Sequence, residues 1–300
     1  MHLSNFSKWE QLGHSNDWIL FPDNIGPYIS IDETSLSQGE LYTVVTNKEG
    51  KGRKGSLIAM IKGTKSDYVR KILESASIKK RKIVKEITLD MAPTMERIAR
   101  FTFPNAKLVT DRFHVQKLAY EAVQELRIKH RWESIEMENN EIELAREMQM
   151  NYIPEVLENG DTLRQLLARS RYLLFKTENK WTPTQHRRAE ILFARYPDIE
   201  QGYRLTMELG MIFHSTKEKG VAFTRLAKWY DKVEKAGFKT FNTLSKSIQE
   251  HYLTILNYFD NRSTNASAES FNAKIKAFRA SFRGVRNVSF FLFRLANIYA

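Results

Sequence analysis

Three carboxylates stand at positions where their chemistry could be used. Asp32 and Asp90 each close an apolar stretch of the kind that forms strands, and Glu269 precedes a run of basic residues. If the two strands are parallel neighbours, both aspartates emerge at one edge of the sheet, where ligands of α/β sheets bind. Close carboxylates repel each other unless a cation bridges them, and Mg²⁺ prefers oxygen ligands. These residues therefore predict a divalent metal site.

Each aspartate also has a simpler interpretation. Asp90, in "LDMAP", could cap the next helix, and Asp32 could end its strand in a turn. Both interpretations stay open beside the metal site.

The C-terminal segment 262–300 has seven Lys or Arg and one acid, Glu269. On a helical wheel Phe271, Ile275 and Phe278 share one arc, which indicates a core face. Glu269 lies on the opposite, polar arc and could be a third metal ligand, or a favourable charge in the first helical turn. We expect the polar residues around it to contact DNA phosphates: Asn272, Lys274, Lys276, Arg279 and Arg283.

The elements that must position these acids follow from the pattern of apolar residues. Strands are predicted at 28–32, 40–45, 56–61, 83–90 and 106–111, the first three as an antiparallel meander. Helices separate the third, fourth and fifth strands, and from residue 115 to about 260 only helical patterns occur. The predicted organisation is a lead segment 1–27, an α/β block 28–116, a helical block 117–260 and C-terminal helices 261–300.

Composition narrows the class of protein. The chain has 300 residues, 42% of them hydrophobic, and a net charge of +12, which favours a polyanionic partner such as nucleic acid or an anionic membrane surface. It has no cysteine, which excludes disulfides, zinc ribbons and thiol nucleophiles. The N-terminus lacks the apolar core of a signal peptide, and no run is long enough to span a bilayer. We expect a cytoplasmic, nucleoid-associated protein without a membrane partner.

Two further segments could contact DNA. Residues 48–85 contain thirteen Lys or Arg against three acids, and the loop "NKEGKGRKG" contributes Lys51, Arg53 and Lys54. Trp181 stands in the polar stretch "ENKWTPT" and could stack on a base, although core packing is the simpler role for a tryptophan.

Together the stretches "ISIDETSLSQG", "ITLDMAPT", "VTDRFHVQK" and "STNASAESFNAKIKAF" resemble bacterial insertion-sequence transposases of the DDE superfamily, in the branch with a D-x-x-H motif. The resemblance covers residues 28–300. It implies a mixed α/β, or α+β, fold: a ribonuclease H-like core with a five-stranded mixed sheet, interrupted by an all-helical insertion. It matches the catalytic triad to Asp32, Asp90 and Glu269, and the D-x-x-H motif to Asp111 and His114. Asp111 is the rival for the second acid, and His114 could be a hydrogen-bonded core residue.

The resemblance also implies an activity and partners. Two Mg²⁺ ions, with Mn²⁺ able to substitute, would support cleavage of element ends and strand transfer by a dimer or larger assembly on DNA. Relatives carry an N-terminal zinc ribbon and helix-turn-helix that this sequence lacks, so a separate chain could recognise the ends. The alternatives are a ribonuclease H-like metal nuclease without strand transfer and a non-catalytic DNA-binding remnant.

Overall fold

The computed structural model describes residues 3–36, 39–281 and 283–300. The chain divides into two compact units. Unit 1 comprises 1–114 and 251–300, and unit 2 comprises 115–250. The helical block was expected over 117–260, but its last ten residues belong to unit 1, because the helix at 252–256 packs on the strand at 107–110.

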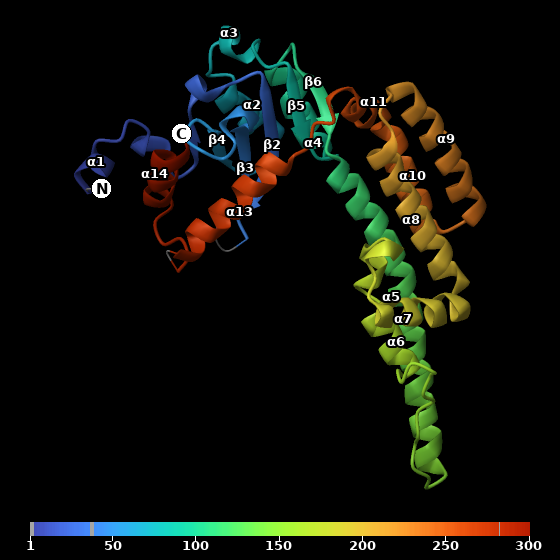
Figure 1. Ribbon diagram of the computed structural model, residues 1–300. Helices are drawn as coiled ribbons and strands as arrows, with labels where there is room; N and C mark the ends of the chain where they lie inside the picture. The colour runs from blue at the N-terminus through green and yellow to red at the C-terminus, as the bar shows by residue number, and fades with distance from the viewer. Residues whose placement is uncertain (1–2, 37–38, 282) are drawn as a thin grey trace. The chain divides into compact units, whose positions relative to one another are not determined.

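Unit 1 is built on a mixed six-stranded sheet (Figure 1). Its spatial order is β1-β4-β3-β2-β5-β6, with β2 parallel to β5, β5 parallel to β6, and the other pairs antiparallel. The strands are β1 (Trp18–Leu20), β2 (Tyr28–Ser35), β3 (Leu41–Asn47), β4 (Leu57–Lys62), β5 (Glu86–Leu89) and β6 (Lys107–Thr110). The predicted meander and the predicted pairing of the first and fourth strands are confirmed.

Two expectations about the sheet were wrong. Five strands were predicted, but β1 adds a sixth at the edge beside β4. Its three residues are too few to show an alternating pattern. The strand beginning at Tyr28 was expected to end at Asp32, but it runs on to Ser35, because all seven residues from Ile29 to Ser35 pair with β3. Asp32 therefore lies within β2 and not at its end.

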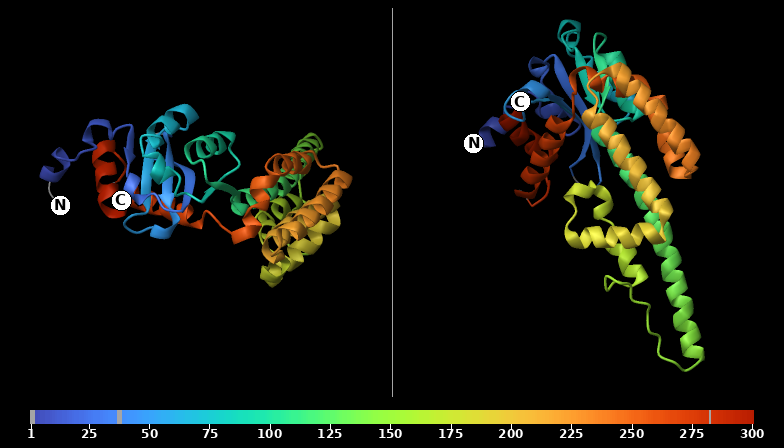
Figure 2. Two further views of the ribbon diagram at one scale, coloured as in Figure 1. Left: turned by 90° about the horizontal axis from the view of Figure 1, so that it is seen from above. Right: turned by 45° about the vertical axis from the view of Figure 1, so that its right-hand side comes forward.

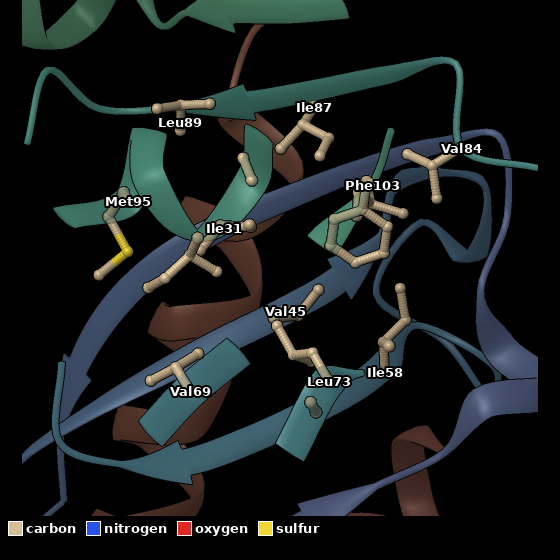
Figure 3. Packing of buried hydrophobic residues seen from close by; sticks show 14 of the residues in the cluster. Ile31, Val45, Ile58, Val69, Leu73, Val84, Ile87, Leu89, Met95 and Phe103 are labelled. Atoms are coloured by element: carbon tan, nitrogen blue, oxygen red, sulfur yellow. The ribbon is translucent and has the colours of Figure 1, made fainter. Parts of the chain in front are cut away.

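Helices cover both faces of this sheet. On one face lie α2 (Ser66–Leu73) and α4 (Pro93–Thr102), whose apolar residues pack on those of β2 and β5 (Figure 3). On the other face α13 (Ala266–Ser281) and α14 (Val288–Tyr299) contribute Phe271, Ile275 and Leu292 to a second core. The remaining helices of unit 1 are α1 (Leu3–Ser7), α3 (Ile78–Arg81), α11 (Tyr252–Leu256) and α12 (Tyr258–Asn261).

Unit 2 is helical, as Figure 2 shows from two further sides. It contains most of α5 (Arg112–Glu147), α6 (Leu163–Arg169), α7 (Pro183–Arg195), α8 (Pro197–Ser215), α9 (Lys219–Ala236) and α10 (Lys239–Glu250). Capping boxes begin α6 at Thr162 and α7 at Thr182, where threonine and glutamine satisfy backbone groups reciprocally.

Single 3₁₀ turns occur in both units. Those of unit 1 are Leu12–His14, Pro22–Asn24 and Lys48–Gly50, and those of unit 2 are Leu173–Phe175 and Glu178–Lys180.

Candidate active site

The acidic residues predicted from the sequence come together on unit 1. Side chains alternate along a strand, so Asp32 lies on the face of β2 opposite Ile29 and Ile31, which belong to the α2–α4 core. Asp90 and Asp111 follow the neighbouring strands β5 and β6 directly. Glu269 lies in the first turn of α13, which crosses the sheet on the Asp32 side. Four carboxylates from four separate elements therefore share one region.

All three aspartates use one carboxylate oxygen in the same way. Oδ1 of Asp32 accepts from the backbone N–H of Glu33 at 2.8 Å, and Oδ1 of Asp90 accepts from that of Ala92 at 2.9 Å. Oδ1 of Asp111 accepts from Phe113 N at 3.2 Å, at the start of α5. Asp90 does not cap α4, whose N-cap residue Ala92 has no side-chain cap; its bond to the N–H of Ala92 closes the turn that precedes the helix. This bond occupies one oxygen and leaves the other available for a different partner.

Burial and mutual repulsion raise the pKa of two of the four carboxyls. For Asp32, loss of hydration raises the pKa most. The N–H of Glu33 and the nearby His114 oppose this, and Asp90 and Asp111 add to it. Loss of hydration also raises the pKa of Glu269, to which Asp111 and Asp32 contribute while His114 opposes. Repulsion from neighbouring carboxylates therefore disfavours the ionised forms of Asp32 and Glu269, a situation that a bound cation would relieve.

Asn272 ties this acidic region to α13. Its Nδ2 donates to Oδ2 of Asp32 at 2.7 Å, and the same nitrogen lies 3.5 Å from the backbone oxygen of Glu33. We expected the Asn272 side chain to contact DNA, but in this structure it donates a hydrogen bond to Asp32.

Lys48 and Glu33 were missed at the sequence level. The Lys48 side chain, only 16% exposed, donates to Oγ1 of Thr88 at 2.8 Å and lies 3.7 Å from Oε1 of Glu86. Burial lowers its pKa, while Glu86 and Asp111 oppose the shift. Glu33 follows Asp32 in β2, and burial together with Asp90 and Asp32 raises its pKa. Only the Asp-Glu pair in "ISIDE" could have indicated Glu33, and no sequence signal indicated Lys48.

The donor atoms suit a divalent cation, but they are not gathered around one point. In the described part of the chain, no three His, Cys, Asp or Glu side chains form a ready-made metal cluster. Two observations support a fit between these residues and a divalent cation. The available ligands are carboxylate oxygens, and Oδ2 of Asp111 is buried without a hydrogen-bond partner. Asp111 itself is 1% exposed. Asn265, at the entry to α13, is fully buried and also leaves both side-chain atoms unsatisfied. Unpaired buried polar atoms are costly, so these groups are suited to bind a water molecule or an ion.

The residues expected to contact DNA divide into two groups. Lys51, Arg53, Lys54, Lys276 and Arg283 are exposed, and Arg279 is half-buried. Lys274, in contrast, donates to the backbone oxygen of Gly52 at 2.8 Å. In unit 2, the indole N–H of Trp181 donates to Leu173 O at 2.8 Å, and its ring packs 5.5 Å from that of Tyr203. Trp181 therefore has a packing role in this structure.

The sheet carries acids on β2 and directly after β5 and β6, beside a helix that bears a fourth acid. Sequence comparison identifies the family to which a chain with this arrangement belongs. A transposase family model of the ISL3 type matches residues 29–295. The chain belongs to this family of DDE transposases.

A curated relative supports this assignment. The chain is 22% identical over 272 residues to the transposase for insertion sequence element IS1001 of Bordetella parapertussis. The match covers 89% of this chain and 60% of the relative, so the chain spans about three fifths of that protein's length. No solved structure matches the chain. No helix among the described residues is long and apolar enough to cross a membrane.

Proposed function

We propose that this chain cleaves DNA at the ends of an insertion sequence and transfers the cut strands on a ribonuclease H-like core. The observation that carries the proposal is the placement of four acids on adjoining elements: Asp32 on β2, Asp90 and Asp111 directly after the neighbouring strands β5 and β6, and Glu269 on α13, which the bond from Asn272 to Asp32 joins to β2. The strand order β4-β3-β2-β5-β6, with α13 across the Asp32 face, supports the ribonuclease H-like assignment.

Asp32, Asp90 and Glu269 are the residues we propose to hold two Mg²⁺ ions, with Mn²⁺ able to substitute. When bound, such ions lower the pKa of an attacking water or 3′-hydroxyl and stabilise the leaving oxygen. The chain's own residues set up this reaction. Asn272 orients Oδ2 of Asp32, and the N–H of Ala92 fixes Oδ1 of Asp90. His114 offsets part of the negative charge beside Asp32 and Glu269.

Cations on the 48–55 loop, on α13 and just after it would hold the DNA backbone: Lys51, Arg53, Lys54, Lys276, Arg279 and Arg283, all exposed except the half-buried Arg279. Contacts of this kind position DNA without reading its sequence. The assembly proposed on DNA is a dimer or larger, and recognition of the ends on a separate chain is compatible with it.

The test is a cleavage and joining assay with a duplex that carries one terminal repeat of the element, in Mg²⁺ or Mn²⁺. Wild type should nick and join the duplex, and Asp32→Asn, Asp90→Asn and Glu269→Gln should each abolish both steps. The matched control is Asp67→Asn, which removes a charge from an exposed surface pair with Arg97 and should leave the rate unchanged. Cleavage that survives in Glu269→Gln would remove that residue from the site.

Two alternatives share part of this evidence. A ribonuclease H-like metal nuclease would cut the duplex without joining it. A non-catalytic remnant would bind DNA equally well with and without the metal and would cut nothing. The same assay distinguishes all three.

A further inference from the structure

The basic loop between β3 and β4 is attached to the helix that carries Glu269. Lys48–Gly50 begins this loop, which ends at Gly55 before β4. Lys51, Arg53 and Lys54 point outward and are exposed, whereas Gly52 among them is buried. The Lys274 ammonium donates to the Gly52 carbonyl at 2.8 Å, so α13 contacts the loop at its one buried residue.

A side chain at Gly52 would be disfavoured for two reasons. Its φ is +68°, in the left-handed region that side chains disfavour. A Cβ atom added there would also lie 2.6 Å from Nζ of Lys274, well inside contact distance. The absence of a side chain therefore makes room for the ammonium group, which also lies 6.0 Å from the centre of the Tyr299 ring.

Lys274 is well placed to hold the helix in register. It lies two residues after Asn272, which binds Asp32, and five residues after Glu269. Through these two bonds α13 is joined to β2 at one point and to the basic loop at another.

We propose that Lys274 is a positioning residue and not a phosphate contact: it fixes α13 to the DNA-contacting loop, so that DNA binding orders Glu269. The role in DNA cleavage rests on the function proposed above, but the attachment itself does not. Lys276, two residues further along and exposed, provides the comparison for a true phosphate contact.

The experiment compares Lys274→Met with Lys276→Met. For Lys274→Met we expect an unchanged Kd for a duplex of arbitrary sequence, an unchanged salt dependence, and a fall of about tenfold or more in single-turnover cleavage at saturating DNA, because misplaced catalytic groups cost rate rather than affinity. For Lys276→Met we expect weaker binding and a plot of log K against log salt whose slope is shallower by about 0.9. If Lys274→Met gives the second pattern, it is a phosphate contact and the proposal fails.

A second pair of variants tests the attachment without using activity. Gly55 has φ +84°, and a Cβ there would meet nothing closer than 3.9 Å. Gly52→Ala and Gly55→Ala therefore cost similar backbone strain, but only Gly52→Ala displaces Lys274. Gly52→Ala and Lys274→Met should both speed amide hydrogen exchange in α13, and Gly55→Ala should not. Equal exchange in all three variants would overturn the proposal, whereas a wild type that never cleaves DNA would overturn only the function proposed above.

Discussion

The side-chain amide of Asn272 on α13 donates to the carboxylate of Asp32 on β2 at 2.7 Å, across 240 residues of sequence. The bond joins the helix that bears Glu269 to the strand that bears the first acid. The other side-chain atom of Asn272, Oδ1, is buried without a partner. Asn272 therefore contributes a hydrogen-bond donor to Asp32, and its acceptor atom makes no bond.

Replacing that donor by an acid should make the fold sensitive to pH. In Asn272→Asp two carboxylates meet, so each raises the other's pKa. A carboxyl whose folded-state pKa is raised contributes stability that is complete below its unfolded pKa and is lost as the pH rises through the folded pKa. Thermal unfolding should show a lower Tm than wild type at pH 8 and a much smaller difference at pH 5. Asn272→Leu, which loses the donor without adding charge, should show a weaker trend with pH, set only by the lost bond to the ionised Asp32.

Neutralising Asp32 should stabilise the metal-free protein. Its folded-state pKa lies above the usual 3.8, so ionising it near neutral pH costs stability. Asp32→Asn keeps an oxygen for the N–H of Glu33, and the Asn272 amide can turn its unpartnered Oδ1 toward the new Nδ2, so the variant should have a higher Tm than wild type at pH 7. The gain should vanish as the pH falls well below 3.8, where the wild-type carboxyl is protonated in both the folded and the unfolded state.

The same variant tests metal binding. Mn²⁺ should raise the Tm of wild type, because a ligand that binds only the native state stabilises it. It should leave Asp32→Asn unchanged. A Tm rise of equal size in both proteins would place the metal elsewhere. Because protons compete for a carboxyl of raised pKa, the wild-type rise should shrink from pH 7 toward pH 5.

Asp90 and Asp111 can be separated by matched amide substitutions. Each accepts a backbone N–H with Oδ1, so both substitutions can retain that bond. Asp90→Asn should lower cleavage by at least about 10³-fold, in line with the loss of a group needed in the transition state. Asp111→Asn should keep cleavage within about tenfold of wild type. The opposite ranking would make Asp111 the second metal ligand.

Unit 2 depends on a buried carboxylate. Asp161 is 1% exposed and pairs with Arg169 and with Arg188, whose Nε lies 2.8 Å away. Burial alone would raise its pKa, but the bonds from the two arginines outweigh that and lower it. Asp161→Ala should cost about 3 kcal/mol in the free energy of unfolding, because it leaves cations without their partner. Glu158→Ala, which breaks an exposed pair with Arg187, should cost less than about 0.5 kcal/mol in the same denaturant titration.

The sheet was predictable because its strands are short apolar runs that end in polar residues. Ile87 and Leu89 mark β5, and the acid after them points to the sheet edge. The continuation of β2 beyond Asp32 could not be predicted, because Glu33 and Ser35 look like a turn until β3 pairs with them. β1 has only three residues, and its pairing with β4 is decided by tertiary contacts.

The chemistry of the site was less predictable than its location. Acids were expected together because each one follows or occupies a strand or begins a helix. Whether a polar residue on α13 faces solvent or the sheet depends on how the helix packs. Asn272 and Lys274 both looked like phosphate contacts, yet one binds Asp32 and the other binds a backbone oxygen. Lys48 looked like one cation in a basic stretch, but it reaches inward to Thr88.

The insertion of unit 2 between His114 and the final segment has a consequence for protein synthesis. Asp32, Asp90 and Asp111 leave the ribosome long before Glu269 does, because residues 115–250 are translated in between. At typical elongation rates the delay is roughly ten to thirty seconds. During this interval the nascent chain holds three of its acids and its basic loop but lacks α13, so the site proposed above is incomplete. A ribosome that stops within unit 2 would release a product without Glu269, which under the proposed function could not cut DNA.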